Sequence, residues 1–166
     1  EENLFSTTIY QKKYSRFGLL RKKLLDRRTD ELIKEYKIKC SEKKEPVRML
    51  SGGNIQKVVV AREFSGEPAL ILANQPTRGI DVGATEFIRN RLVDLRSNGA
   101  AVLLISADLN EVLEVSDSLL VLNSGGVGAY FPDASAVSED LLGEYMLGLR
   151  QMTAGEIGGA VHETKA

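Results

Sequence analysis

Apolar residues recur along this chain with two different periods, and the alternation predicts both helices and short strands. Between about Phe17 and Tyr36 the spacing is helical, so a small helical region is expected there. The charged segment from Cys40 to Arg48 is expected to be a loop that leads to Ser51, a good helix N-cap residue. A helix is predicted from Ser51 to about Phe64, because Gly66 and Pro68 follow and stop it.

Short apolar runs follow that helix, and near-continuous runs of this kind are typical of strands buried on both faces. A helical stripe from Ala84 to Ser97 separates the first two runs, so the alternation implies right-handed crossovers and a parallel sheet. The runs are Ala69 to Ala73, Ala100 to Ser106 and Leu119 to Leu122. Val127 to Phe131 is expected to add a strand and Ser138 to Leu149 a last helix.

These elements predict an α/β fold in three parts. Residues 1–65 are expected to form a helical subdomain that ends in the helix after Ser51, and residues 66–152 an α/β core. Residues 153–166 are rich in Gly, Ala and Glu and are predicted to be a disordered tail, with the single histidine, His162, inside it.

Composition narrows the class of protein. With 166 residues, 43% hydrophobic and 27% charged, the chain is expected to be one soluble globular domain with a core of its own. Its net charge of −1 gives no global nucleic-acid or membrane signature. The single cysteine, Cys40, allows no internal disulfide and fits a reducing compartment. The chain begins at Glu1 without an initiator methionine, which fits a fragment of a longer polypeptide.

Candidate chemistry begins at the two adjacent glycines after Ser51. Glycines let a backbone approach a ligand closely, and Gly52 and Gly53 stand where the predicted helix starts, so its N–H groups can meet a phosphate. Alone, the same residues would equally fit a glycine-rich turn before a helix. The chain contains no G-x-x-x-x-G-K-[ST] loop to cradle β- and γ-phosphates.

The order of two motifs resembles the second half of an ABC-type ATPase domain. The signature segment, Leu50 to Lys57, is followed at the right distance by a strand ending in Gln75-Pro76-Thr77 and then by Asp81. The segment Pro76 to Ala84 narrows the resemblance to tandem-domain ATPases of bacterial importers for monosaccharides and nucleosides. The match covers about residues 45–150 and implies a partial P-loop NTPase fold, with a mostly parallel sheet, a small helical subdomain and no P-loop strands.

The resemblance assigns roles to particular residues. In this family ATP lies between two domains, so Ser51, Gly52 and Gly53 are implied to bind the γ-phosphate of ATP held by a partner domain. Gln56 is implied to brace the signature turn. Asp81 matches the family's D-loop aspartate at the dimer seam, although an acid there also fits a simple helix start ahead of Val82.

Other positions depart from the family pattern. Asn74 stands where the family has the aspartate that holds Mg²⁺, Gln75 where it has the catalytic glutamate, and Ala107 where it has the switch histidine. An amide cannot act as a general base, and loss of such a base typically costs ~10²–10⁴-fold in rate. No catalytic residue and no metal ligand is therefore assigned to this chain, and ATP and Mg²⁺ are expected only in the full assembly.

The preferred interpretation is part of the carboxy-terminal nucleotide-binding domain of a tandem importer ATPase. Its partners would be the amino-terminal nucleotide-binding domain of the same polypeptide and a permease that holds it at the cytoplasmic face of the membrane, with no nucleic acid. Basic residues near the start, including Arg21, Lys22 and Lys23, would dock on the permease or form a solvated helix face. The isolated fragment is not expected to turn over ATP.

Two alternatives are open, one of them from the same superfamily. A chromosome-maintenance or DNA-repair ATPase of the SMC type would need a heptad coiled coil before Ser51 and an intact acidic pair, which the sequence lacks. The second alternative is a non-enzymatic regulatory or structural module whose nucleotide site has been abandoned. Because the family's sheet is completed by strands absent from this sequence, Ala69 to Ala73 is expected to have an open edge or an uncovered face and to promote self-association.

Overall fold

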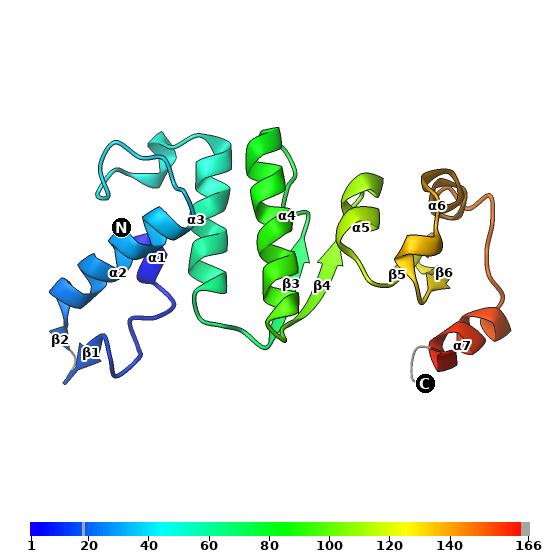
Figure 1. Ribbon diagram of the computed structural model, residues 1–166, viewed down its shortest axis with the longest axis horizontal. Helices are drawn as coiled ribbons and strands as arrows, with labels where there is room; N and C mark the ends of the chain where they lie inside the picture. Colours follow the sequence, from blue (N-terminus) through cyan, green and yellow to red (C-terminus); the bar gives the residue numbers. More distant parts are fainter. Residues whose placement is uncertain (18, 164–166) are drawn as a thin grey trace. The chain divides into compact units, whose positions relative to one another are not determined.

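The computed structural model describes residues 1–17 and 19–163, which fold into two compact units (Figure 1). The first unit runs from Glu1 to Leu103 and the second begins at Leu104. The predicted boundary at residue 65 therefore falls inside the first unit. The reason is tertiary packing, because the helices on either side of that boundary lie against each other.

The first part of unit 1 is helical around a small hairpin. Helix α1 spans Glu2–Phe5 and α2 spans Lys22–Glu35. Between them β1 (Ser15–Arg16) and β2 (Leu19–Leu20) pair antiparallel, so the helix expected from Phe17 begins only at Lys22. Helix α2 buries one face, formed by Leu25, Thr29 and Leu32. The buried Thr29 hydroxyl donates to the Leu25 carbonyl at 3.0 Å, which satisfies its polar group.

Helix α3, Gly52–Phe64, is the central element of unit 1 and has Ser51 as its N-cap, as predicted. A 3₁₀ turn at Val47–Met49 leads into it. Its apolar residues are buried on more than one side because α1 and α4 both pack against it. Burying each large apolar side chain contributes about 1.5–3 kcal/mol. The buried apolar residues of α3 are Val58, Val60, Ala61 and Phe64.

The strand–helix–strand unit predicted after α3 is present. Strand β3 spans Leu70–Asn74, helix α4 spans Val82–Ser97 and strand β4 spans Ala101–Ile105, and β3 pairs with β4. The expectation that β3 is buried on both faces is wrong. Ile71 and Ala73 are buried, but Leu70 and Leu72 remain 60% and 69% exposed, and Leu103 on β4 is 53% exposed. The prediction of an uncovered sheet face is thereby confirmed.

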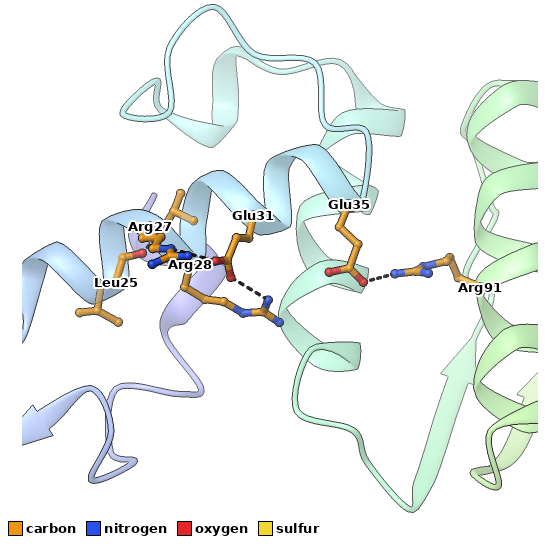
Figure 2. A network of polar contacts seen from close by, with 7 residues as sticks. Leu25, Arg27, Arg28, Glu31, Glu35 and Arg91 are labelled. Carbon is orange, nitrogen blue, oxygen red and sulfur yellow. Dashed lines mark hydrogen bonds and ion pairs between the residues drawn. The ribbon is translucent and has the colours of Figure 1, made fainter.

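An aromatic and charged cluster joins α2, α3 and α4. Arg91 of α4 forms an ion pair with Glu35 of α2 (Figure 2), and its guanidinium lies 4.5 Å from the centroid of the Tyr36 ring. Tyr36 meets Phe87 edge to face, and the ammonium of Lys57 lies 4.9 Å from the Phe87 ring centroid. Burial raises the pKa of the Tyr36 hydroxyl, and the charge of Arg91 opposes that shift. The cluster fixes the helices around α3 relative to one another.

Unit 2 is an antiparallel hairpin with helices on it. Strands β5 (Leu119–Asn123) and β6 (Gly126–Phe131) are joined by Ser124 and Gly125, both at positive φ, as a two-residue hairpin turn requires. Helix α5 spans Leu109–Val115, a 3₁₀ turn spans Ala134–Ala136 and α6 spans Glu139–Met146. The core of this unit consists of Leu119, Val121, Ala129, Ala134, Val137 and Leu142.

The segment predicted to be a disordered tail holds helix α7, Ala154–Glu163, which packs against β6. Its start is a capping box. The Glu156 carboxylate accepts from the backbone N–H and the hydroxyl of Thr153 at 2.7 and 2.8 Å, and these bonds lower the pKa of Glu156. His162 lies in this helix. Residues 164–166 of the predicted tail lie outside the described residues.

Candidate functional site

The candidate site is built around the N-terminus of α3. Ser51 has an extended backbone, φ −64° and ψ 157°, and the first bond of the helical ladder runs from the Ile55 N–H to the Ser51 carbonyl at 2.9 Å. The N–H groups of Gly52 and Gly53 lie ahead of that ladder, at the positive end of the helix dipole. Ser51 and Gly52 are exposed. This corner of the molecule therefore presents hydrogen-bond donors, suited to an anion.

The two glycines differ in their surroundings, although the sequence assigned them one role. A Cβ on Gly53 would lie 2.5 Å from Asp81 Oδ2 and 2.9 Å from the Cβ of Ala84. A Cβ on Gly52 would meet only the Gly79 carbonyl, at 3.9 Å. Gly53 therefore lets α3 approach the start of α4 closely, while Gly52 leaves the exposed backbone accessible.

Asp81 is the N-cap of α4, and its Oδ1 accepts from the Ala84 N–H at 2.9 Å. The helix-start role weighed for this residue is thus present. The same carboxylate lies directly behind Gly53, so the predicted D-loop residue and the predicted signature are neighbours within one chain. The two roles are compatible, because the capping bond fixes the carboxylate beside the signature.

Gln56 ties α3 to the turn after β3. Its Nε2 donates to the Pro76 carbonyl at 2.8 Å, and Pro76 itself is buried. That turn is tightly formed, with Gln75 at φ +50° and Gly79 at φ +73°. This hydrogen bond holds the turn after β3 against α3, so the positions of the turn and of the helix are coupled.

Sequence reasoning missed Asn54. Its Oδ1 accepts from the backbone N–H of Lys39 at 2.7 Å, and its Nδ2 donates to the Ser51 hydroxyl at 2.9 Å. The residue lines an open hollow together with Lys39, Cys40, Ser41, Met49 and Ser51. A signal existed, because a polar amide three residues after a serine N-cap resembles the spacing of a capping box.

The departures from the family pattern lie at the ends of strands. Asn74 is the exposed last residue of β3 and Gln75 is half-buried beside it. Ala107 belongs to unit 2, in the connection between β4 and α5. Asn74 and Gln75 offer neutral amide oxygens, and residues 1–17 and 19–163 contain no group of three His, Cys, Asp or Glu able to hold a metal ion. These donors do not fit a magnesium site formed by this chain alone.

Comparison with curated proteins gives relatives of one kind. The chain is 39% identical over 158 residues to the guanosine import ATP-binding protein NupO of Bacillus subtilis (strain 168), which covers 95% of this chain and 31% of that protein. It is 38% identical over 148 residues to the nucleoside import ATP-binding protein NupA of Lactococcus lactis, covering 89% of this chain and 29% of that protein.

The ribose import ATP-binding protein RbsA of Chromobacterium violaceum is 34% identical over 157 residues, 95% of this chain and 29% of that protein. The chain thus spans 29–31% of the length of these relatives. No family model matches it.

Solved structures agree on the fold. A dimeric structure of the bacterial ABC transporter cassette MJ0796 matches with a TM-score of 0.59 and 26% identity, over 69% of this chain and 50% of that one. The ATP-binding cassette MJ1267 matches with a TM-score of 0.69 at 21% identity, over 89% of this chain and 60% of that one. Within the described part of the chain, no helix combines the length and apolarity needed to cross a bilayer. The chain belongs to the ABC transporter ATP-binding proteins and forms part of an ABC cassette.

Proposed function

We propose that this chain is the signature-bearing part of the ATP-binding subunit of a bacterial importer for a simple sugar or a nucleoside. The observation that carries the proposal is the geometry at the start of α3. Ser51 and Gly52 are exposed there, while Gly53 is buried with the exposed Asp81 carboxylate beside it. The named activities of the relatives, import of guanosine, nucleosides and ribose, support the class of solute.

The signature would act on ATP bound by a partner domain, the amino-terminal nucleotide-binding domain of the same polypeptide. The Ser51 hydroxyl and the first N–H groups of α3 would donate to the γ-phosphate. Preorganised donors of this kind stabilise the charge that develops during phosphoryl transfer. Gln56 and Asp81 would keep these donors in place through their contacts with Pro76 and α4.

The nucleotide site to which the family resemblance assigns Asn74, Gln75 and Ala107 would bind ATP without efficient hydrolysis. Neither amide supplies the negative charge that Mg²⁺ needs or a base to accept a proton, and alanine supplies no imidazole. An intact signature beside degenerate strand ends supports an asymmetric pair of sites, in which only the partner's site turns over. ATP and Mg²⁺ are thus cofactors of the full assembly.

The basic start of the chain would dock on the permease and hold the subunit at the cytoplasmic face of the membrane. No Asp or Glu occurs between Glu2 and Asp26, and Arg21, Lys22 and Lys23 are exposed at the start of α2. Phe17 and Leu19 are 92% and 76% exposed beside them. Exposed apolar residues framed by cations are suited to a protein surface that is apolar and acidic.

The test is ATP hydrolysis by the full-length protein reconstituted with its permease. Ser51→Ala removes one donor to a charged group, a loss of about 1.5–3 kcal/mol, so the rate should fall about tenfold or more. Ser97→Ala, at the exposed end of α4, is the matched control and should leave the rate unchanged. Unchanged hydrolysis in Ser51→Ala would refute the signature role and favour a regulatory module whose nucleotide site has been abandoned.

A further inference from the structure

The side-chain amide of Asn54 has an orientation dictated by its partners. The Lys39 backbone N–H, 2.7 Å from Oδ1, can only donate, so the oxygen of the amide must face it. The NH₂ group then faces the Ser51 hydroxyl, and Nδ2 lies 2.9 Å from Oγ. Asn54 thus bridges the loop after α2 to Ser51, the N-cap of α3.

This bond determines what the Ser51 hydroxyl can still do. A hydroxyl has one proton to donate and two lone pairs, and the bond from Asn54 uses a lone pair. The Ser51 proton therefore stays available for an acceptor outside the chain. The other serine N-cap behaves differently, because the Ser138 hydroxyl accepts from the Leu141 N–H at 3.3 Å and caps its helix. Ser51 accepts no capping bond from the described residues of α3.

We infer that Asn54 is a positioning residue, which holds the Ser51 hydroxyl as a donor toward the terminal phosphate of ATP on the partner domain. The inference rests on the function proposed above for Ser51. The loop contributes because the Lys39 bond prevents the amide from rotating and offering its oxygen to Ser51. With its oxygen turned to Ser51, the amide would accept a hydrogen bond from the Ser51 hydroxyl and leave a hydroxyl lone pair facing the phosphate.

A double-mutant cycle in the full-length reconstituted protein tests this inference. The variants are Ser51→Ala, Asn54→Ala and the double substitution, and the readouts are ATP hydrolysis at saturating Mg-ATP and the affinity for ADP. Asn90→Ala is the control, since Asn90 is an exposed asparagine on α4. Melting temperatures of the purified variants separate loss of fold from loss of positioning.

If Asn54 acts through Ser51, Asn54→Ala lowers hydrolysis by roughly two- to tenfold, and the double variant is no slower than Ser51→Ala. ADP affinity stays at the wild-type value, because ADP lacks the γ-phosphate. Multiplicative losses, or a matching loss of ADP affinity, would overturn the inference while leaving the signature role intact. No effect of Ser51→Ala would instead refute the proposed function itself.

A second variant keeps the shape of the side chain and changes only its hydrogen bonding. Asn54→Asp can still accept from the Lys39 N–H but cannot donate to Ser51, so the Ser51 hydroxyl would donate to the carboxylate and turn away from the phosphate. Hydrolysis should fall further than in Asn54→Ala, while Asn90→Asp, with the same charge change on α4, should have no effect. Wild-type hydrolysis by Asn54→Asp would overturn the inference.

Discussion

The signature helix α3 and the strand β3 lie in the same compact unit but differ in completeness. Helix α3 is packed by α1 and α4, and its first turn is held by Asn54, Gln56 and the carboxylate of Asp81. Strand β3 has one buried face, one exposed apolar face, and neutral amides at its end. The same chain thus carries a fully supported donor site and a strand end without catalytic charges.

The contrast teaches that the two halves of an ABC site place different demands on a chain. Donating hydrogen bonds to a phosphate needs backbone geometry and close packing, which α3 retains within this segment. A carboxylate can neutralise a bound cation and accept a proton, whereas Asn74 and Gln75, where β3 ends, are neutral amides that do neither. The packing of α3 does not require charged residues at the end of β3, because no contact that holds α3 depends on a charge at Asn74 or Gln75.

The largest effect is expected from substitutions at the closely packed start of α3. Gly53→Ala would push a methyl group against Asp81 and Ala84, and overpacking of this kind costs about 1–3 kcal/mol. We expect a lower melting temperature and a loss of ATP hydrolysis in the full-length protein. Gly53→Arg should abolish hydrolysis altogether.

Gly52→Ala is the matched comparison, because the space around Gly52 is open. Its melting temperature should stay close to that of the wild type, while hydrolysis falls through crowding of the exposed backbone. If Gly53→Ala were as stable as Gly52→Ala, the close approach of α3 to α4 would not be the reason for the second glycine.

The exposed face of β3 and β4 is expected to cause association between chains. The exposed leucines of β3 and β4 form an apolar face, and such faces pair between chains. The isolated segment is therefore expected to self-associate in sedimentation at high concentration. Leu72→Lys should reduce this association, whereas Leu147→Lys, also an exposed leucine, should not. A monomeric wild-type segment with a cooperative unfolding transition would contradict the prediction.

The isolated segment should also fail to bind nucleotide tightly. Its described residues offer donors for a γ-phosphate at Ser51 but no cluster of metal ligands, and its sequence has no P-loop. Calorimetric titration with Mg-ATP should show no binding in the micromolar range and no turnover. Tight binding would mean that the end of β3 contributes to holding Mg-ATP although its residues are neutral amides.

Sequence alone predicted the elements whose signals are local. Ser51 as N-cap and the Gly66 and Pro68 stop define α3, and the apolar runs locate β3 and β4 within a residue or so. The antiparallel pairing of β1 with β2 was missed because Phe17 and Leu20 fit a helical period equally well. Helix α7 was missed because its Gly-rich composition obscured the capping box between Thr153 and Glu156.

The candidate site was predictable where a motif names residues and not where distant residues meet. Ser51, Gly52 and Asp81 are exposed residues at helix starts, and the roles that the resemblance implies for them stay predictions. That Gly53 must be small because of Asp81 and Ala84 depends on how closely two helices approach. The bridge from Lys39 through Asn54 to Ser51 depends on the path of a loop. No sequence period encodes either contact.

The smallest effect is expected at Gln75. Substitutions there are the sharpest test of the proposal that only one of the two nucleotide sites hydrolyses ATP. Gln75→Ala removes an amide that supplies no base, so steady-state ATP hydrolysis by the reconstituted full-length protein should change far less than in Gly53→Arg, where loss of a preorganised donor costs about 2.7–4 kcal/mol. Gln75→Glu should not raise the rate either, because Asn74 and Ala107 still lack the carboxylate and imidazole. Because Gln75 has a left-handed backbone, φ +50°, both variants carry the same strain and serve as controls for each other. Equal losses in Gln75→Ala and Gly53→Arg would mean that this site is catalytically engaged, and the contrast between α3 and β3 would then not be functional.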